Sequence, residues 1–527
     1  MDCEMPYVNN EFTRYNPLHK ELNLTLPNKI ATYENRLSYN KFEITDTHGN
    51  KKVCFKKFIT LVDYVKFLIG KYKTDNLEIL PGNNNDNNTL FDEYVHSHNN
   101  YAYVDAFFYY LTSKLLENGF VHGLDYYDSY VCLTNNCEID IVDDFEYLCD
   151  SNYFNEKLNT LFSFKDKNLG DFFNKKEPIT IKDEDIALEF EQLDLDVDDL
   201  DNVIIDDIEI EVIDEHDSEL ESNNESNDSD TDSEVVNDSE SDNGSDYETE
   251  TETESNSGSN NGSTRGSETS NSKDEIEKLI LIIKKIPTQV VAIENCENTF
   301  DSLLEDNITI EELESAMFQV IVMLHVYQNT FDFTHNDLHT NNIMYISTTE
   351  PFLYYKINNI FYKIPTFGKI YKIIDFGRAI YHVNKKIVCS DSFSVNGTAH
   401  TQYNCEPFYN KDKNIVEPNK SFDLCRLACS MIDFIIDDIK ELEKFKEVPI
   451  YDLIISWIYD DNGINVLYKK NGEERYPDFK LYKMIARIVH NHIPVKQFSH
   501  PCFNKYVQES LQKYMDVDKL IKSLGHL

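Results

Sequence analysis

The chain has 527 residues, enough for several domains and a large buried core. Its formal charge is −46, but 33 acids and a single Arg between Asp183 and Glu268 give that segment −32, which leaves only −14 for the rest. This mild acidity argues against a nucleic-acid partner, which needs a broad basic surface. No apolar run reaches the roughly 18 residues that span a bilayer, so no membrane partner is expected.

The first predicted elements are those of a β-rich region. Residues 1–30 show no strong periodicity, and residues 1–39 are predicted to form an irregular lead-in. Residues 40–58 alternate in polarity on both sides of Gly49, which predicts a β-hairpin. Residues 101–116 are aromatic and aliphatic over about four turns and predict a buried helix. Strand-like sequence returns over residues 123–133.

An acidic insertion is predicted at about residues 134–273. Residues 186–213 keep Leu, Ile and Val between the acids, so short local structure is possible there. Residues 218–272 are Ser, Asp, Glu, Asn, Gly and Thr with almost no apolar side chains. Such a chain cannot bury enough surface to offset its ordering entropy, so this part is predicted to be disordered.

Regular structure is predicted again after the insertion. We expect a helix near Asp274–Lys285 and an apolar strand at residues 289–293. A helix begins after Thr309, which can cap it together with Glu312. Residues 354–374 contain three strand-like runs, and the sequence from Asp423 onward is mostly helical with loops.

Two short motifs carry the chemistry. The segment His335-Asn336-Asp337-Leu338-His339-Thr340-Asn341-Asn342 resembles the catalytic loop of protein kinases, H-x-D-L-x-x-x-N. In that loop the aspartate orients the attacking hydroxyl and accepts its proton, while the asparagine five residues later binds a metal ion on the nucleotide phosphates. The resemblance therefore gives these roles to Asp337 and Asn342. It puts His339 at the position that contacts the transferred phosphate.

The second motif is an apolar strand that ends in Asp375-Phe376-Gly377. It resembles the D-F-G motif of kinases, in which the aspartate bridges magnesium to the β- and γ-phosphates. Gly377 permits the backbone turn that starts the activation segment. Asp423 resembles the buried aspartate that bonds the catalytic-loop backbone, although an ordinary helix cap explains it equally well.

The chain as a whole resembles the protein kinase superfamily, and it is most similar to serine/threonine protein kinases of nucleocytoplasmic large DNA viruses. The resemblance covers residues 40–133 and 287–527. It implies a bilobed α+β fold, with a β-rich small lobe over residues 40–296 that the acidic insertion interrupts and a helical large lobe over residues 297–527. It also implies ATP and Mg²⁺ as cofactors.

The nucleotide-binding residues are expected from the same resemblance. Strand alternation lets only one of Lys56 and Lys57 face inward, and the resemblance favours Lys57 as the phosphate anchor. Its partner acid would be Asp105, a shorter side chain than the usual Glu. The hinge contacts to adenine would be main-chain atoms of Glu294 and Cys296, although a plain strand-to-helix turn explains that segment equally well.

Some features depart from the kinase pattern. No G-x-G-x-x-G loop precedes the lysine strand, Asn336 replaces the usual Arg, and His339 replaces the Lys of serine/threonine kinases. The expected function is ATP- and Mg-dependent phosphorylation of Ser or Thr hydroxyls on a protein substrate. The alternatives are a small-molecule kinase of the choline or aminoglycoside type, which His339 favours, and a pseudokinase scaffold, which the missing glycine loop and Asp105 favour.

The place of action is predicted from the N-terminus and the resemblance. Residues 1–4 lack the basic and apolar regions of a secretory signal, and the eleven cysteines are expected to be reduced thiols. The protein is therefore expected in the host cell cytoplasm or in the virion.

Overall fold

The computed structural model describes residues 8–25, 27–74, 77, 80–81, 90–142, 144–166, 278–436 and 439–525. The fold is mixed α+β. The predicted disordered stretch 218–272 and the acidic residues 186–213 lie outside the described residues. Within the described ranges no helix combines the length and the apolar character that crossing a membrane requires.

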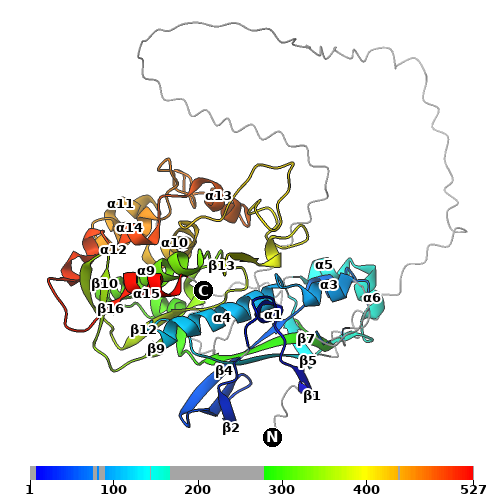
Figure 1. The fold of residues 1–527 in the computed structure, drawn as a ribbon. Helices are drawn as coiled ribbons and strands as arrows, with labels where there is room; N and C mark the ends of the chain where they lie inside the picture. The colour runs from blue at the N-terminus through cyan, green and yellow to red at the C-terminus, as the bar shows by residue number, and fades with distance from the viewer. Residues whose placement is uncertain are drawn as a thin grey trace, which may run out of the picture. The chain divides into compact units, whose positions relative to one another are not determined.

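The largest sheet joins strands from both sides of the acidic stretch (Figure 1). Its seven strands are β1 (Val8–Thr13), β2 (Ile30–Arg36), β3 (Lys41–Asp46), β4 (Lys51–Thr60), β5 (Tyr126–Asp140), β6 (Phe162–Phe164) and β7 (Ile280–Glu294). They follow the order β1-β5-β7-β4-β3-β2, and β6 pairs with β7. All of these pairings are antiparallel.

The hairpin predicted over residues 40–58 is confirmed as the β3–β4 pair. Gly49 adopts a φ of 84°, a left-handed conformation that suits glycine in the connecting turn. The carboxylate of Asp46 closes the turn, because it accepts the N–H groups of His48 and Asn50 at 2.9 and 2.8 Å. Strand β4 therefore has a fixed register, and its neighbouring residues Lys56 and Lys57 face opposite sides of the sheet.

Two predicted boundaries in this region are wrong. The lead-in is not irregular, because β1 pairs with β5, β2 pairs with β3, and helix α1 (Pro17–Glu21) lies between them. Regular structure does not stop near residue 134 either. Strand β5 continues to Asp140, α5 (Phe145–Cys149) and α6 (Asn152–Lys157) follow, and β6 then pairs with β7. These pairings provide backbone partners that local periodicity does not reveal.

The helix predicted near Asp274–Lys285 is also wrong, because residues 280–285 form the start of β7 and residues 274–277 lie outside the described chain. The run Ile280-Leu281-Ile282-Ile283 alternates between half-buried and buried positions along the strand. Isoleucine is β-branched and packs well on a pleated surface, and β5 supplies the ladder hydrogen bonds. Strand pairing therefore outweighs the helical pattern here. The strand predicted at residues 289–293 is confirmed within β7.

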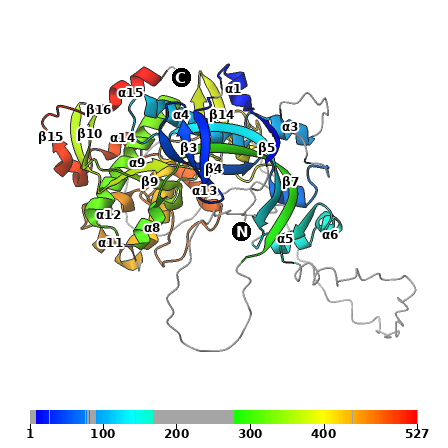
Figure 2. The same ribbon diagram turned by 90° about the horizontal axis from the view of Figure 1, so that it is seen from below.

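Helix α4 (Tyr101–Glu117) confirms the predicted buried helix and lies against β5 and β7 (Figure 2). The side chain of Asn100 caps it by accepting the N–H of Ala102 at 3.0 Å. The short helices α2 (Tyr64–Leu68) and α3 (Leu90–His96) precede it. Helix α4 is buried on most sides, so its few polar residues meet other parts of the chain.

Helix α9 (Ile310–Phe331) is the second buried helix, and α12, α14 and α15 pack against it. Thr309 caps it as predicted, because its hydroxyl accepts the N–H of Glu312 at 3.2 Å. Further helices lie along the chain, most of them labelled in Figure 1. They are α8 (Phe300–Glu305), α10 (Phe422–Ile435), α11 (Leu442–Phe445), α12 (Pro449–Ser456), α13 (Lys480–Ile488), α14 (Pro494–Gln497) and α15 (Val517–Leu524).

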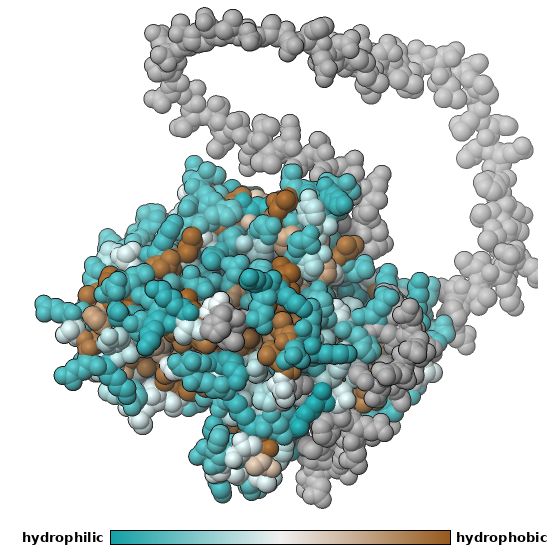
Figure 3. All heavy atoms as spheres, in the orientation of Figure 1, coloured by the Kyte–Doolittle hydropathy of each residue, from teal (hydrophilic) through white to brown (hydrophobic). Residues whose placement is uncertain are grey.

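The three strand-like runs predicted over residues 354–374 are confirmed as β10 (Phe352–Ile357), β11 (Ile360–Pro365) and β12 (Lys369–Ile373). The remaining strands are β8 (Asn298–Thr299), β9 (Ile343–Ser347), β13 (Ile380–Val383), β14 (Lys386–Cys389), β15 (Val507–Gln508) and β16 (Met515–Asp516). Strand β12 pairs with β9, which brings the end of the catalytic-loop motif beside the strand that ends at the Asp-Phe-Gly motif. The surface in Figure 3 is mainly hydrophilic, with apolar residues in small scattered groups.

Candidate active site

Lys57 lies between two acids that are far away in sequence. Its Nζ is 3.0 Å from Asp105 Oδ2 on α4 and 2.9 Å from Asp375 Oδ1 after β12. Burial would lower the pKa of Lys57, but the two carboxylates raise it well above its usual value, so the ammonium stays charged. The structure thus brings together three residues that the sequence analysis singled out.

Lys56 points to the other face of the sheet. Its Nζ lies 4.1 Å from the ring centroid of Tyr33 and 4.6 Å from that of Phe42, and burial lowers its pKa. Within the described part of the chain no carboxylate comes within 4.0 Å of it. The two neighbouring lysines therefore have different surroundings, and Lys57 is the one that meets Asp105 and Asp375.

Asp105 serves two partners at once. While Oδ2 pairs with Lys57, Oδ1 accepts the N–H of Phe376 at 2.6 Å. Its side chain is only 1% exposed, and this burial raises its pKa, opposed chiefly by the charge of Lys57. The short acid reaches both groups because α4 packs close to the Asp-Phe-Gly segment.

The Asp-Phe-Gly segment is held by its backbone and by aromatic packing. Asp375 has a φ of 63°, in the left-handed region that non-glycine residues seldom adopt, and its N–H donates to Tyr109 Oη at 3.0 Å. Phe376 is fully buried between Phe108 and Tyr109, with ring centroids 4.6 and 5.0 Å away. This anchoring leaves the Asp375 side chain 43% exposed, beside Lys57.

The backbone of the catalytic-loop motif is held by Asp423, which lies on α10. This fully buried carboxylate accepts the N–H of His335 at 3.0 Å and that of Asn336 at 2.9 Å. Asn336, where kinases usually have Arg, donates to the carbonyl of Arg378 at 2.9 Å and accepts the hydroxyl of Tyr403 at 2.7 Å. Asp423 therefore bonds to the loop backbone rather than capping its own helix, in which it lies two residues after the N-cap Ser421.

Asp337 sits among cations and hydrogen-bond donors. Tyr482 Oη donates to its Oδ1 at 2.8 Å, and Arg378 Nη1 is 3.8 Å from its Oδ2. Burial alone would raise the pKa of this carboxyl, but the charges of Arg378 and Arg426 lower it to about 2. Asp337 is therefore an anion at neutral pH, able to accept a hydrogen bond.

Asn342 folds back on the loop. Its Nδ2 donates to the carbonyl of Asp337 at 2.9 Å and to His339 Nε2 at 3.0 Å. An amide nitrogen only donates, so His339 Nε2 acts as the acceptor and the ring is neutral. Burial also lowers the pKa of His339. With both contacts made by its nitrogen, Asn342 keeps its amide oxygen for a ligand.

The two predicted hinge residues have different environments. Glu294 ends β7, where its N–H donates to the carbonyl of Asp125 at 2.8 Å and its carboxylate pairs with Lys372 at 3.0 Å. Cys296 follows the strand and is buried. Among the described residues nothing forms a hydrogen bond with its backbone N–H or carbonyl, so both groups are available to bond a ligand.

Three residues near Asp337 were not predicted: Arg378, Arg426 and Tyr482. Arg378 directly follows the Asp-Phe-Gly motif and Arg426 lies three residues after Asp423, and Arg is scarce in this chain, with seven among the 49 basic residues. That scarcity was an available signal. Tyr482 lies 145 residues after Asp337 on a separate helix, and nothing local in the sequence indicates their contact.

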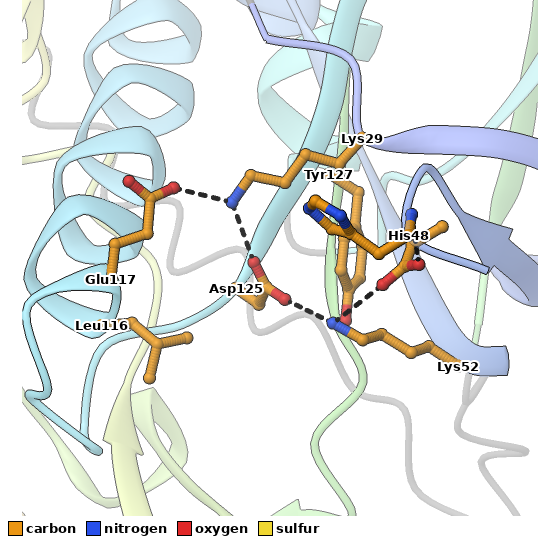
Figure 4. Close-up of a pocket in the computed structure, with 8 residues that line it drawn as sticks. Lys29, His48, Lys52, Leu116, Glu117, Asp125 and Tyr127 are labelled. Carbon is orange, nitrogen blue, oxygen red and sulfur yellow. Dashed lines mark hydrogen bonds and ion pairs between the residues drawn. The ribbon is translucent and has the colours of Figure 1, made fainter. Parts of the chain in front are cut away.

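A hollow of about 360 Å³ near the end of α4 is separate from these motifs (Figure 4). Its charged side chains pair with one another: Lys29 with Asp125 and Glu117 at 3.2 and 3.0 Å, and Lys52 with Asp125 and Asp46 at 2.8 and 3.6 Å. Each of the two lysines is paired with two carboxylates, so neither is left to bind an anionic ligand.

No family model matches the chain, and no curated protein matches it either. The function is therefore inferred from the geometry of these residues.

Proposed function

We propose that the protein transfers a phosphoryl group from ATP, with Mg²⁺, to Ser or Thr hydroxyls of a protein substrate. The observation that carries this proposal is the position of Lys57, with its Nζ 3.0 Å from Asp105 and 2.9 Å from Asp375. In protein kinases a lysine on the third strand of the small lobe pairs with an acid on the next helix while the D-F-G aspartate holds the metal. Lys57, Asp105 and Asp375 reproduce that set in one cluster.

The arrangement of strands supports a bilobed kinase fold. Counted from β2, the lysine strand β4 is third, and it lies between β3 and the strand β7 that leads to Cys296. In this proposal the large sheet is the small lobe and the helices around α9 form the large lobe. The free backbone groups of Cys296 would then meet adenine.

The residues fit a magnesium ion of the kind that nucleotides carry. Within the described ranges no group of three or more His, Cys, Asp or Glu is placed to hold a metal ion. Mg²⁺ at phosphotransfer sites commonly has one or two protein oxygen ligands and takes the others from phosphates and water. The exposed carboxylate of Asp375 and the amide oxygen of Asn342 are such ligands. When bound, Mg²⁺ would neutralise charge on the β- and γ-phosphates.

The chain's own groups would act mainly by positioning. Lys57 would hold the α- and β-phosphates, as the corresponding kinase lysine does. Asp337, an anion held by Tyr482, would orient the acceptor hydroxyl and receive its proton. The rate then comes from geometry and charge rather than from a covalent intermediate on the protein.

The test is an assay with γ-labelled ATP and Mg²⁺ against panels of proteins and of small alcohols. The proposal expects label on Ser or Thr of protein acceptors and none with Asp375→Asn. Label on small alcohols alone would favour the second candidate, a small-molecule kinase, for which the neutral His339 in the catalytic loop is the supporting observation. A purified protein that binds ATP but labels neither panel would favour the remaining alternative, a pseudokinase scaffold. The host cell cytoplasm or the virion, as the resemblance implies, stays the proposed location.

A further inference from the structure

Two guanidinium groups lie beside the single carboxylate of Asp337. Arg378 Nη1 is 3.8 Å from Asp337 Oδ2. Arg426 reaches the same carboxylate through Tyr482, because its Nε donates to Tyr482 Oη at 2.8 Å and that hydroxyl donates to Asp337 Oδ1 at 2.8 Å. The two guanidinium carbons lie 5.8 and 5.0 Å from the Tyr482 ring centroid, so all three groups form one cluster.

This cluster has more positive than negative charge. In the described part of the chain no carboxylate lies within 4.0 Å of Arg426, and Asp337 is the one carboxylate that close to Arg378. Only the Nε of Arg426 is engaged by Tyr482, which leaves its terminal nitrogens without an acceptor among the residues that the structure describes. An excess positive charge that is partly shielded from water is costly until an anion joins it. The cluster is therefore built to receive an anion next to the proton acceptor.

We infer that Arg426, assisted by Arg378, contacts the phosphoryl group while it passes to the acceptor hydroxyl. This inference rests on the proposed function. In the transfer the bond from the γ-phosphorus to the ADP oxygen breaks, the bond from the acceptor oxygen to phosphorus forms, and the acceptor proton goes to Asp337. Charge on the three oxygens of the moving group needs a nearby cation.

Tyr482 is a positioning residue in this arrangement. Its hydroxyl accepts from Arg426 and donates to Asp337, which fixes the guanidinium and the carboxylate relative to each other. The contact uses Oδ1, while Oδ2, with Arg378 Nη1 3.8 Å away, has no hydrogen bond among the described residues and can accept the hydroxyl of the substrate. Three elements meet at this hydroxyl: the catalytic loop, α10 and α13.

The experiment compares Arg426→Met, Arg426→Lys and Tyr482→Phe with the wild type. We expect kcat to fall by about 10³-fold in Arg426→Met, the lower end of what a catalytic arginine contributes, while the KM for ATP changes little. Arg426→Lys keeps the charge and recovers part of the rate. Added guanidinium ions restore part of the activity of Arg426→Met, which a merely structural defect would not allow. Arg475→Met is the matched control, since Arg475 Nε donates to the carbonyl of Asn465 instead.

A second measurement does not depend on turnover. Binding of Mg-ADP with aluminium fluoride, which mimics the moving phosphoryl group, should weaken strongly in Arg426→Met, while binding of Mg-ADP alone stays within about twofold of the wild type. Equal losses for both ligands, no guanidinium rescue, or turnover like that of Arg475→Met would overturn the role of Arg426. A wild-type protein that transfers no phosphoryl group to any acceptor would instead overturn the proposed function.

Discussion

Replacing Lys57 with Met tests the cluster on which the proposed function rests. The variant leaves Asp105, 1% exposed, without its positive partner, whereas Asp375 is 43% exposed and can turn to water. Removing one partner of a buried ion pair destabilises a protein by about 3–5 kcal/mol, and protonation of Asp105 keeps the loss near the lower figure. We expect about 3 kcal/mol in the free energy of unfolding and a loss of turnover of about 100-fold or more, because the phosphates lose their anchor.

Lys56→Met is the matched control on the same strand. Lys56 packs against aromatic rings, and Met fills nearly the same volume, so we expect a change in unfolding free energy of only about 1 kcal/mol and little loss of turnover. The double variant Lys57→Met/Asp105→Asn separates stability from catalysis. Its amide oxygen still accepts from Phe376, so stability should partly return while turnover stays low.

The stability difference between wild type and Lys57→Met should change with pH in a direction that the pKa of Asp105 sets. Burial raises the pKa of Asp105, and loss of Lys57 raises it further. A carboxyl whose pKa is higher in the folded state favours folding at low pH and loses that contribution as the pH rises through the folded value. Denaturant unfolding should therefore show a smaller gap between wild type and Lys57→Met at about pH 5 than at about pH 8. Equal turnover losses in the two Met variants, or a gap that is the same at both pH values, would refute this reasoning.

Three further predictions follow from single residues or segments. Asp375→Asn should abolish Mg-dependent transfer of label from ATP, because a neutral amide is a poor ligand for a hard cation, and undiminished turnover would remove Asp375 from the site. Burial raises the pKa of Asp391 to about 7, although hydrogen bonds from Tyr101 and Tyr94 oppose this rise. Lys66 and Asp63 are the other charged groups nearby. The contribution of Asp391 to the free energy of unfolding is therefore lost as the pH rises through about 7. The thermal midpoint, followed by scanning fluorimetry, should accordingly fall more from about pH 5 to about pH 8 in the wild type than in Asp391→Asn, and parallel curves would contradict this. Deletion of residues 218–272 should leave the thermal midpoint and turnover nearly unchanged, since its composition cannot support a core; a large loss of either would show that the segment packs on the fold.

The sequence predicted well what short segments encode. The turn at Gly49, the cap at Thr309 and the strand before Asp375 depend on neighbouring residues, and the structure confirms each. Contacts between distant segments could not be predicted from the sequence. The pairing of β1 with β5 and the hydrogen bond from Tyr482 to Asp337 join residues more than 100 positions apart, and no local pattern marks either one.

Helix α4 shows how a local pattern gains meaning only from the fold. Tyr101, Asp105 and Tyr109 follow an i, i+4 spacing and lie on one face of a largely buried helix. The N–H of Tyr101 donates to Asp391 at 3.0 Å, Asp105 accepts from Phe376, and Tyr109 accepts from Asp375. All three partners belong to the segment that begins at the Asp-Phe-Gly motif.

Three points along α4 therefore bind that segment: a backbone N–H at the start of the helix and the side chains of Asp105 and Tyr109 further along it. A shift of α4 by one turn would break all three bonds and also separate Asp105 from Lys57. The shorter side chain of Asp105 makes this coupling tighter, because Asp tolerates less displacement than Glu before it loses both partners. The contacts among Lys57, Asp105 and Asp375 thus depend on the position of α4. The Asp at position 105 is explained by this close packing, and it need not indicate a lost active site.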